Sequence, residues 1–114
     1  MPGGPICFAN QQRDRAMNDN EMIVQREDEA TTGRYVIKLS PTAEAEMTFR
    51  KSDNGNIIID HTGVPPAFQG RGIAATLVEF AVADARKNHF RITPVCSYAV
   101  NQFRRHSNWS DIKA

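Results

Sequence analysis

The stretch that most constrains the fold is residues 64–74, with the sequence Val-Pro-Pro-Ala-Phe-Gln-Gly-Arg-Gly-Ile-Ala. Its two prolines lack backbone N–H groups, so a preceding β-strand is expected to end there. Gly70 and Gly72 allow the backbone to bend and to approach a ligand closely. The first turn of a helix has N–H groups without intrahelical partners and carries the positive end of the helix dipole. A strand, a glycine loop and a helix N-terminus in this order favour a phosphate-binding site.

Two well-known phosphate-binding motifs fit this loop less well. A P-loop requires Lys-Ser/Thr after its glycines, and none follows here. Residues 70–75 fit the loose dinucleotide pattern Gly-x-Gly-x-x-Gly/Ala. That fold requires an acidic residue about 20 positions further on, where the next candidate strand ends at residues 95–97 without one. A tight turn that binds nothing is the remaining alternative.

The segments before the loop show the alternation of β-strands. Apolar and polar residues alternate over 34–39 and 43–50, and an apolar run begins the segment 57–64. Turn-forming residues separate these segments, including Asn54-Gly55, which suits a tight hairpin. The pattern predicts an antiparallel meander of three strands. Ile23-Val24 begins either an edge strand or a short approach segment.

The segments after the loop predict one main helix, a further strand and a short C-terminal helix. Apolar residues recur with helical spacing over 73–88. A strand over 91–96 then follows by a strand–helix–strand crossover, so it should lie parallel to the strand 57–64. Ser97 is a candidate cap for a helix over about 98–105. We therefore expect an α/β domain with a four-stranded mixed sheet. Three C-terminal side chains are expected to pack back on the core: Phe103, Trp109 and Ile112.

Length and composition limit the classes of function. The chain has 114 residues, enough for one small domain, which we place at 22–114 after a flexible leader at 1–21. A formal net charge of +1 gives no reason to expect nucleic acid or a membrane surface as partner. With Cys7 in the leader, a disulfide framework is not expected, so we predict an intracellular, reducing, cytoplasmic setting. We also expect a monomer or weak dimer. Scattered histidines and cysteines give no metal-ligand spacing.

The loop resembles a known cofactor-binding motif. Residues 69–74 match Gln/Arg-x-x-Gly-x-Gly/Ala, the coenzyme A pyrophosphate loop of the Gcn5-related N-acetyltransferase superfamily. Residues 60–65 (Asp-His-Thr-Gly-Val-Pro) and 94–98 (Pro-Val-Cys-Ser-Tyr) resemble its small, single-domain, YjdJ-like branch. The resemblance covers about 22–112 and implies a minimal acetyltransferase fold. Typical members carry further N-terminal helices and strands, so the acceptor site here is expected to be open, or completed by a partner or a second copy.

The resemblance also implies where coenzyme A lies. The pantetheine arm would occupy the split between the third and fourth strands, pairing with main-chain groups from Thr62 to Val64. Arg71 is a candidate for a charge-assisted contact with a phosphate, its alternative being a solvated surface residue. Tyr98 and Asn101 lie one helical turn apart and are further cofactor-binding candidates. The pyrophosphate would bind the amides of Gln69, Gly70, Arg71, Gly72, Ile73 and Ala74.

Two residues are candidates for catalysis. Cys96 ends a predicted strand and precedes a predicted helix, a position that favours the nucleophilic thiolate; its alternative is a buried packing residue. His61 is a candidate base if it faces the split between the strands, and a polar strand residue if it faces outward. In ordinary acetyltransferases a tyrosine on the last helix donates a proton to the leaving thiolate. Tyr98 lies earlier in the sequence than that tyrosine would, so the resemblance does not assign it this role.

The leading functional hypothesis is transfer of an acetyl group from acetyl-coenzyme A to an amine, with Cys96 as a candidate intermediate carrier. The alternative is a non-catalytic module that binds coenzyme A or acyl-coenzyme A, because the same loop would serve both. A nicotinamide-binding fragment is a third hypothesis, disfavoured by the missing acidic residue.

Overall fold

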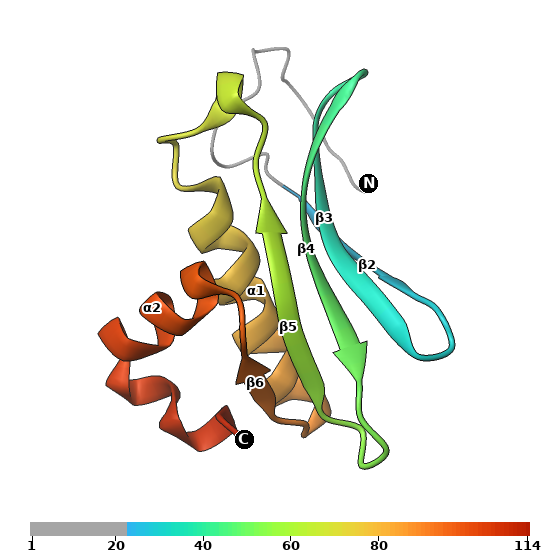
Figure 1. Ribbon diagram of the computed structural model, residues 1–114, viewed down its shortest axis with the longest axis vertical. Helices are drawn as coiled ribbons and strands as arrows, with labels where there is room; N and C mark the ends of the chain where they lie inside the picture. Colours follow the sequence, from blue (N-terminus) through green and yellow to red (C-terminus); the bar gives the residue numbers. More distant parts are fainter. Residues whose placement is uncertain (1–22) are drawn as a thin grey trace, which may run out of the picture.

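The computed structural model describes residues 23–114, which form one mixed sheet flanked by helices (Figure 1). The sheet has five strands in the order β2-β3-β4-β5-β6. The first four are antiparallel neighbours, and β6 is parallel to β5. The mixed α/β class, the meander and the parallel crossover predicted from the sequence are therefore confirmed. The strands are β2 (Val24–Asp28), β3 (Thr32–Ser40), β4 (Ala43–Lys51), β5 (Ile57–Gly63) and β6 (Ile92–Pro94).

The sheet has one strand more than the four expected. Of the two alternatives for Ile23-Val24, the edge strand is the one observed, since β2 pairs with β3 from Val24↔Ile37 to Asp28↔Gly33. The strand was hard to recognise because four of its five residues are polar or charged. An edge strand is held mainly by backbone hydrogen bonds to its one neighbour, so it needs little apolar character.

The strand β6 is shorter than predicted. It pairs with β5 only from Ile57↔Ile92 to Ile59↔Pro94, after which the N–H groups of Val95 and Cys96 both point to the carbonyl of Ile59. β5 continues to Gly63 beyond this point, while the other chain turns into a helix. The two strands thus part beyond Ile59, as the predicted split between them requires.

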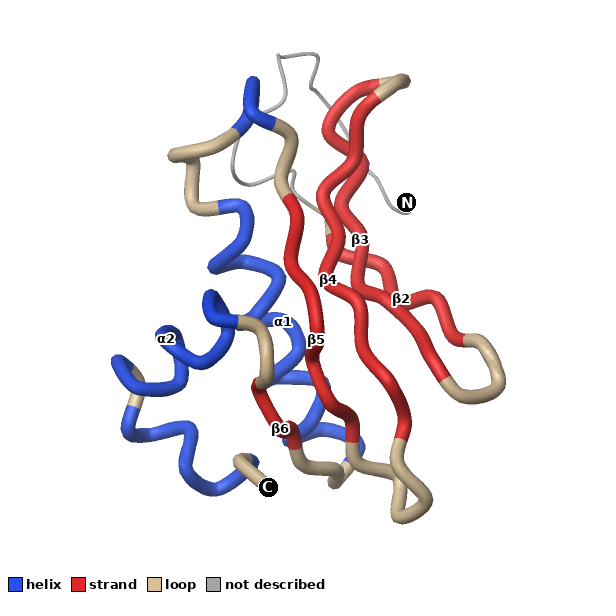
Figure 2. Tube along the Cα trace, in the orientation of Figure 1, coloured by secondary structure: helices blue, strands red, loops and turns tan. Residues whose placement is uncertain are grey.

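One long helix covers a face of the sheet. Helix α1 (Ile73–Asn88) has the predicted bounds and runs alongside β5 in the view of Figures 1 and 2. It packs against β3 and β4. It ends at His89, whose φ of 62° is the left-handed conformation common at helix C-termini. Its buried residues are Ile73, Leu77, Val78, Ala81, Val82 and Ala85.

The C-terminal segment closes the β6 edge of the molecule. It consists of helix α2 (Ser97–Arg105) and the 3₁₀ segment η3 (Ser107–Ile112), which lie together beside β6 in Figure 2. Phe103, Trp109 and Ile112 are buried as predicted. The cap of α2 differs from the expectation: Cys96, not Ser97, is the N-cap, and its sulfur accepts a hydrogen bond from the Ala99 N–H.

A β-bulge in β5 determines which residues face the helix. Thr48 pairs with His61 and Phe49 pairs with Ile59, so Asp60 is an extra residue on β5. Directly opposed residues on neighbouring strands point to the same face of a sheet. The bulge therefore reverses the alternation that Ile57 and Ile59 establish, and this reversal has consequences for the site.

Candidate functional site

The loop between β5 and α1 is built on prolines and on glycines that use left-handed backbone. A 3₁₀ turn, η2 (Pro66–Phe68), follows the strand, and the Phe68 N–H donates to the Pro65 carbonyl at 2.9 Å. Gly70 and Gly72 have φ angles of 83° and 76°, which disfavour any residue with a Cβ. A Cβ at either position would meet no atom of residues 23–114 within 4 Å. The described part of the chain thus leaves the space beside both glycines open.

The start of α1 presents free donors at this loop. The N-cap is Gly72, and within the described residues it receives no side-chain cap. Thr76 is the first residue of the helix whose N–H bonds back, to the Gly72 carbonyl at 3.0 Å. The N–H groups of the three preceding residues have no intrahelical acceptor. Since the first turn contains no acidic residue, the positive end of the dipole is left for an external anion.

A pocket of about 400 Å³ joins the loop to the end of β5 and to α2. It brings together eight of the residues predicted to bind coenzyme A, although they come from three different elements. It also contains Phe68, which the sequence analysis missed. The sequence feature that could have identified Phe68 is its position as an aromatic residue between the prolines and glycines of the loop. The lining residues are Thr62, Val64, Phe68, Gln69, Gly70, Gly72, Ile73, Ala74 and Tyr98.

Cys96 lies next to this pocket through its contact with Thr62. The Cys96 Sγ is 3.4 Å from the Thr62 Oγ1 and 3.4 Å from the Ala99 N. The sulfur is therefore held between the end of β5 and the first turn of α2. The side chain is half-buried, and Cys96 is a free cysteine. Cys7 lies outside the described residues.

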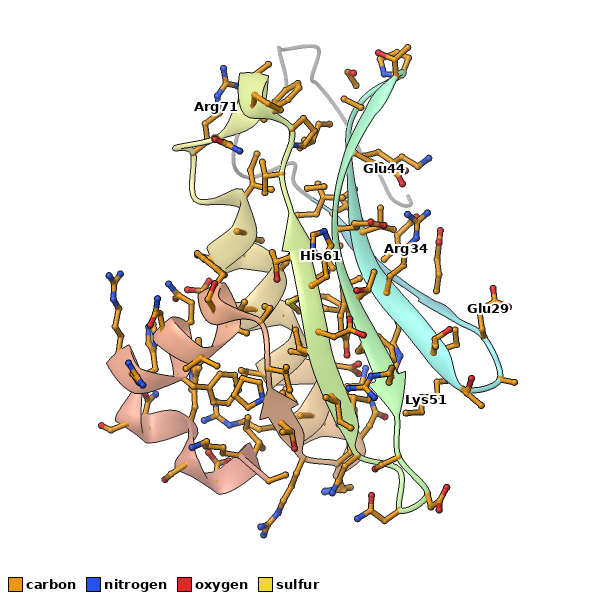
Figure 3. The ribbon with its side chains drawn as sticks, in the orientation of Figure 1. Glu29, Arg34, Glu44, Lys51, His61 and Arg71 are labelled. Atoms are coloured by element: carbon orange, nitrogen blue, oxygen red, sulfur yellow. The ribbon has the colours of Figure 1, made fainter. Side chains whose placement is uncertain are left out.

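His61 and Cys96 are on opposite faces of the sheet. His61 is opposed to Thr48, whereas Thr62 is opposed to the buried Met47. Because neighbouring residues of a strand point to opposite faces, the contact of Thr62 with Cys96 places the imidazole on the other side. His61 is exposed, and its side chain is labelled on β5 in Figure 3. Of the two orientations considered from the sequence, the outward one is observed.

The remaining candidates lie at different distances from the pocket. Tyr98 lines it, and burial, partly offset by Arg105 and reinforced by Glu79, raises the pKa of its phenol. Tyr98 is thus a protonated donor at neutral pH. Asn101 is exposed on α2 and is not among the lining residues. The Arg71 guanidinium lies 5.4 Å from the centre of the Phe68 ring, at the loop end of the molecule (Figure 3).

Gln69 connects the two sides of the loop. Its Nε2 donates to the Val64 carbonyl at 3.1 Å, which fixes the strand end relative to the first glycine. Among residues 23–114, no group of three or more potential ligands is placed to hold a metal ion. In the same part of the chain no helix has the length and apolar character needed to cross a membrane.

Comparisons with known proteins agree on one family. The family model for GCN5-related N-acetyl-transferase matches residues 34–112, well over half of the chain. The chain is also similar to a solution structure of a GCN5-like candidate N-acetyltransferase from Staphylococcus aureus, with 30% identity and a TM-score of 0.60 over 79% of this chain and 87% of that one. No curated protein sequence matches the chain. The matched segment contains the glycine loop, the pocket and Cys96, and the chain belongs to the GCN5-related N-acetyltransferase family.

Proposed function

We propose that this protein transfers an acetyl group from acetyl-coenzyme A to an amine. The observation that carries the proposal is a pocket lined by the start of α1 and by Thr62, the residue that contacts Cys96. The start of α1 presents backbone donors without intrahelical partners, and the Cys96 sulfur lies 3.4 Å from the Thr62 hydroxyl. The membership of the chain in an acetyltransferase family supports the same reaction class.

The residues present suit coenzyme A. The open N–H groups at the start of α1 and the two left-handed glycines would hold the pyrophosphate. Phe68 and Ile73 give the pocket apolar surface for the pantetheine arm. Beyond Ile59, β5 has no pairing with β6, so its main-chain groups near Thr62 are available on that side. Acetyl-coenzyme A supplies an acyl group activated as a thioester.

On the covalent route Cys96 carries the acetyl group. The Cys96 sulfur forms a bond to the acetyl carbon as the original thioester bond breaks, and the thiol proton goes to the departing thiolate. The amine then forms the N–C bond as the Cys96–acetyl bond breaks, and the amine proton returns to the Cys96 sulfur. Tyr98 lines the pocket and is protonated, so it is a candidate to relay this proton, donating to the departing thiolate and taking up the proton that the thiol gave up.

On the direct route an amine attacks the thioester without an acetyl-cysteine. This route needs a base near the pocket, and His61 is the sequence-based candidate. Its position on the face opposite Thr62, which lines the pocket, argues against a role in deprotonating an amine bound there. We therefore favour the covalent route.

The test combines binding, adduct formation and turnover. Thermal shifts are measured with acetyl-coenzyme A, coenzyme A, NAD and ATP, and a ligand at about 100 times its Kd should add ~2.7 kcal/mol of stability. Incubation with acetyl-coenzyme A alone should add one acetyl group to Cys96 by intact mass. Cys96→Ala should lose both the adduct and turnover. No shift with millimolar acetyl-coenzyme A would refute the donor assignment, and a fully active Cys96→Ala would refute the covalent route.

A non-catalytic coenzyme A-binding module is the second candidate. It is favoured by the outward positions of His61 and Asn101, which leave no base beside the sulfur among the predicted residues. Binding without adduct or turnover, across a panel of small primary amines and lysine peptides, would identify it. For either function we propose an intracellular, reducing setting, because Cys96 is a free thiol. We also propose that the protein is a monomer or weak dimer.

A further inference from the structure

We propose that the Thr62 side chain is a positioning residue for Cys96, holding its sulfur toward the pocket through a hydrogen bond. The inference rests on the proposed function, because it assigns a role in presenting the nucleophile of that reaction. The family resemblance assigned Thr62 only through main-chain contacts with the cofactor. The hydroxyl makes a separate contact, with the sulfur of Cys96.

Thr62 lies between the pocket and the sulfur. Its Oγ1 is 3.4 Å from the Cys96 Sγ, and the residue also lines the pocket. It reaches the sulfur because the bulge at Asp60 turns Thr62 to the same face as the buried Met47. The Ala99 N–H approaches the sulfur from α2 at 3.4 Å. Two polar groups from separate elements thus converge on one sulfur atom.

The chemistry of a hydroxyl suits both states of the thiol. A hydroxyl both donates and accepts, and its hydrogen rotates freely. In the neutral state the Cys96 S–H can donate to the Thr62 oxygen. When the thiol gives up its proton to solvent before it attacks, the Thr62 O–H turns and donates to the sulfur anion. The Ala99 N–H donates in both states, so the anion has two donors, and hydrogen bonds to charged groups are the stronger ones.

This contact also connects two parts of the site. The backbone of Thr62 belongs to the strand end where the pantetheine arm would pair, and its side chain fixes the nucleophile. A displacement of this strand end therefore moves both together. Sub-ångström placement of reacting groups is a large contribution to enzymatic rate.

The experiment isolates the hydroxyl with two matched pairs of variants. In a Cys7→Ser background, residue 62 is made Thr, Val, Ser or Ala. Thr and Val differ by a hydroxyl in place of a methyl group, and Ser and Ala differ by the hydroxyl alone. The rate of Cys96 alkylation by iodoacetamide is followed by intact mass at a fixed pH near neutral. Thr48→Val is the matched control, because it removes a hydroxyl that donates to Asp60 at 2.6 Å on the opposite face.

Within each pair the variant without the hydroxyl should react about five- to tenfold more slowly, the effect of one hydrogen bond to a charged group. Thr62→Ser and Thr48→Val should stay within about twofold of the parent. Equal rates within the Thr/Val pair, or a Ser variant as slow as Ala, would overturn the inference. Should Thr62→Val lose its melting transition, the Ser/Ala pair gives the decision.

Alkylation needs no acetyl-coenzyme A, so the inference and the proposed function fail separately. A hydroxyl effect on alkylation without acetyl transfer would refute the function alone. Acetyl transfer that is equally fast in all four proteins would refute the inference alone. If both hold, Thr62→Val should lower kcat about five- to tenfold while the Kd for acetyl-coenzyme A changes less than twofold.

Discussion

The two ends of helix α1 are stabilised in opposite ways. Near its C-terminal end Asp84 accepts hydrogen bonds from Arg26 on β2 and from the Tyr35 hydroxyl on β3, each at 2.7 Å. We call these three residues the polar lock. At the N-terminal end the cap is a glycine, and within residues 23–114 no side chain accepts a hydrogen bond from the N–H groups of the first turn. The comparison teaches that the fold satisfies its polar groups where the helix meets the edge strand and leaves them open where a ligand would bind.

The surroundings of the two ends match this difference. In the polar lock the Arg26 guanidinium lies 4.9 Å from the centre of the Phe49 ring and 5.4 Å from that of Phe90. Burial, together with the hydrogen bond to Asp84, holds the pKa of Tyr35 well above its usual range. The phenol therefore stays neutral and donates. At the other end, among residues 23–114, the loop offers main-chain donors and the exposed Arg71, while the Gln69 amide is bonded to the Val64 carbonyl.

Gly72→Val should give the largest effect, at the open end. A left-handed φ costs a residue with a Cβ about 1–2 kcal/mol, and the branched side chain would enter the space left beside the glycine. We expect the melting transition to persist at a lower temperature, while the ~2.7 kcal/mol gained with acetyl-coenzyme A at 100 times its Kd disappears. Calorimetric titration checks the binding. Normal affinity in the variant would place the ligand elsewhere.

Asp84→Ala should give the next largest effect, at the closed end. It leaves Arg26 and Tyr35 without their shared partner, and loss of a partly buried charged acceptor costs about 2 kcal/mol. Asp84 is eleven residues along the helix from Ile73, or about 16 Å. Urea unfolding should therefore show the loss while the Kd for acetyl-coenzyme A stays unchanged. A change in Kd as large as the change in stability would show that the two ends are coupled.

Tyr35→Phe tests the same lock through pH. Its hydroxyl is worth about 1 kcal/mol at neutral pH. The folded pKa of Tyr35 is raised above the ordinary value of 10.0, so its contribution is present below pH 10 and is lost as the pH rises above that value. Urea unfolding from about pH 8 to about pH 11 should show a steeper alkaline loss in the wild type than in the variant. Parallel curves would contradict the assignment.

Arg71→Ala should give the smallest effect. The side chain is exposed and stacks on Phe68, so the free energy of unfolding should change by less than about 0.5 kcal/mol. A charge-assisted contact with a phosphate predicts about a tenfold weaker affinity for coenzyme A, with a difference that shrinks as salt is added. Arg50→Ala on the outer face of the sheet is the matched control. Equal affinities in all three proteins would leave Arg71 as a solvated residue.

The sequence predicted α1 and the meander well because their signals are local. Helical spacing determined the bounds of α1, and turn residues marked the bends of the meander. The loop residues could be predicted because proline and glycine restrict or free the backbone whatever the tertiary context. The strand β2 was ambiguous because its position depends on pairing with β3, and because four of its five residues are polar or charged.

The site was harder to predict because it depends on one non-local feature. Simple alternation from Ile57 and Ile59 would carry His61 to the helix-facing side, but the bulge at Asp60 turns it outward and brings Thr62 inward. Nothing in the residues of β5 alone announces the bulge, which arises from pairing with β4. The cap of α2 was misplaced for a similar reason, since Cys96 reaches its position only when β6 ends at Pro94.

The bulge at Asp60 also bears on how a site of this kind changes between related genes. A deletion of that single codon would leave plain alternation along β5, with Ile59 inward, His61 outward and Thr62 inward, so both side chains would keep their present faces. The neighbour of Cys96 would still be a hydroxyl, and the strand would lose only Asp60 and its hydrogen bond with Thr48. At this point of the fold, the bulge therefore absorbs a change in strand length without altering the chemistry beside the thiol, whereas a substitution at position 62 alters it directly.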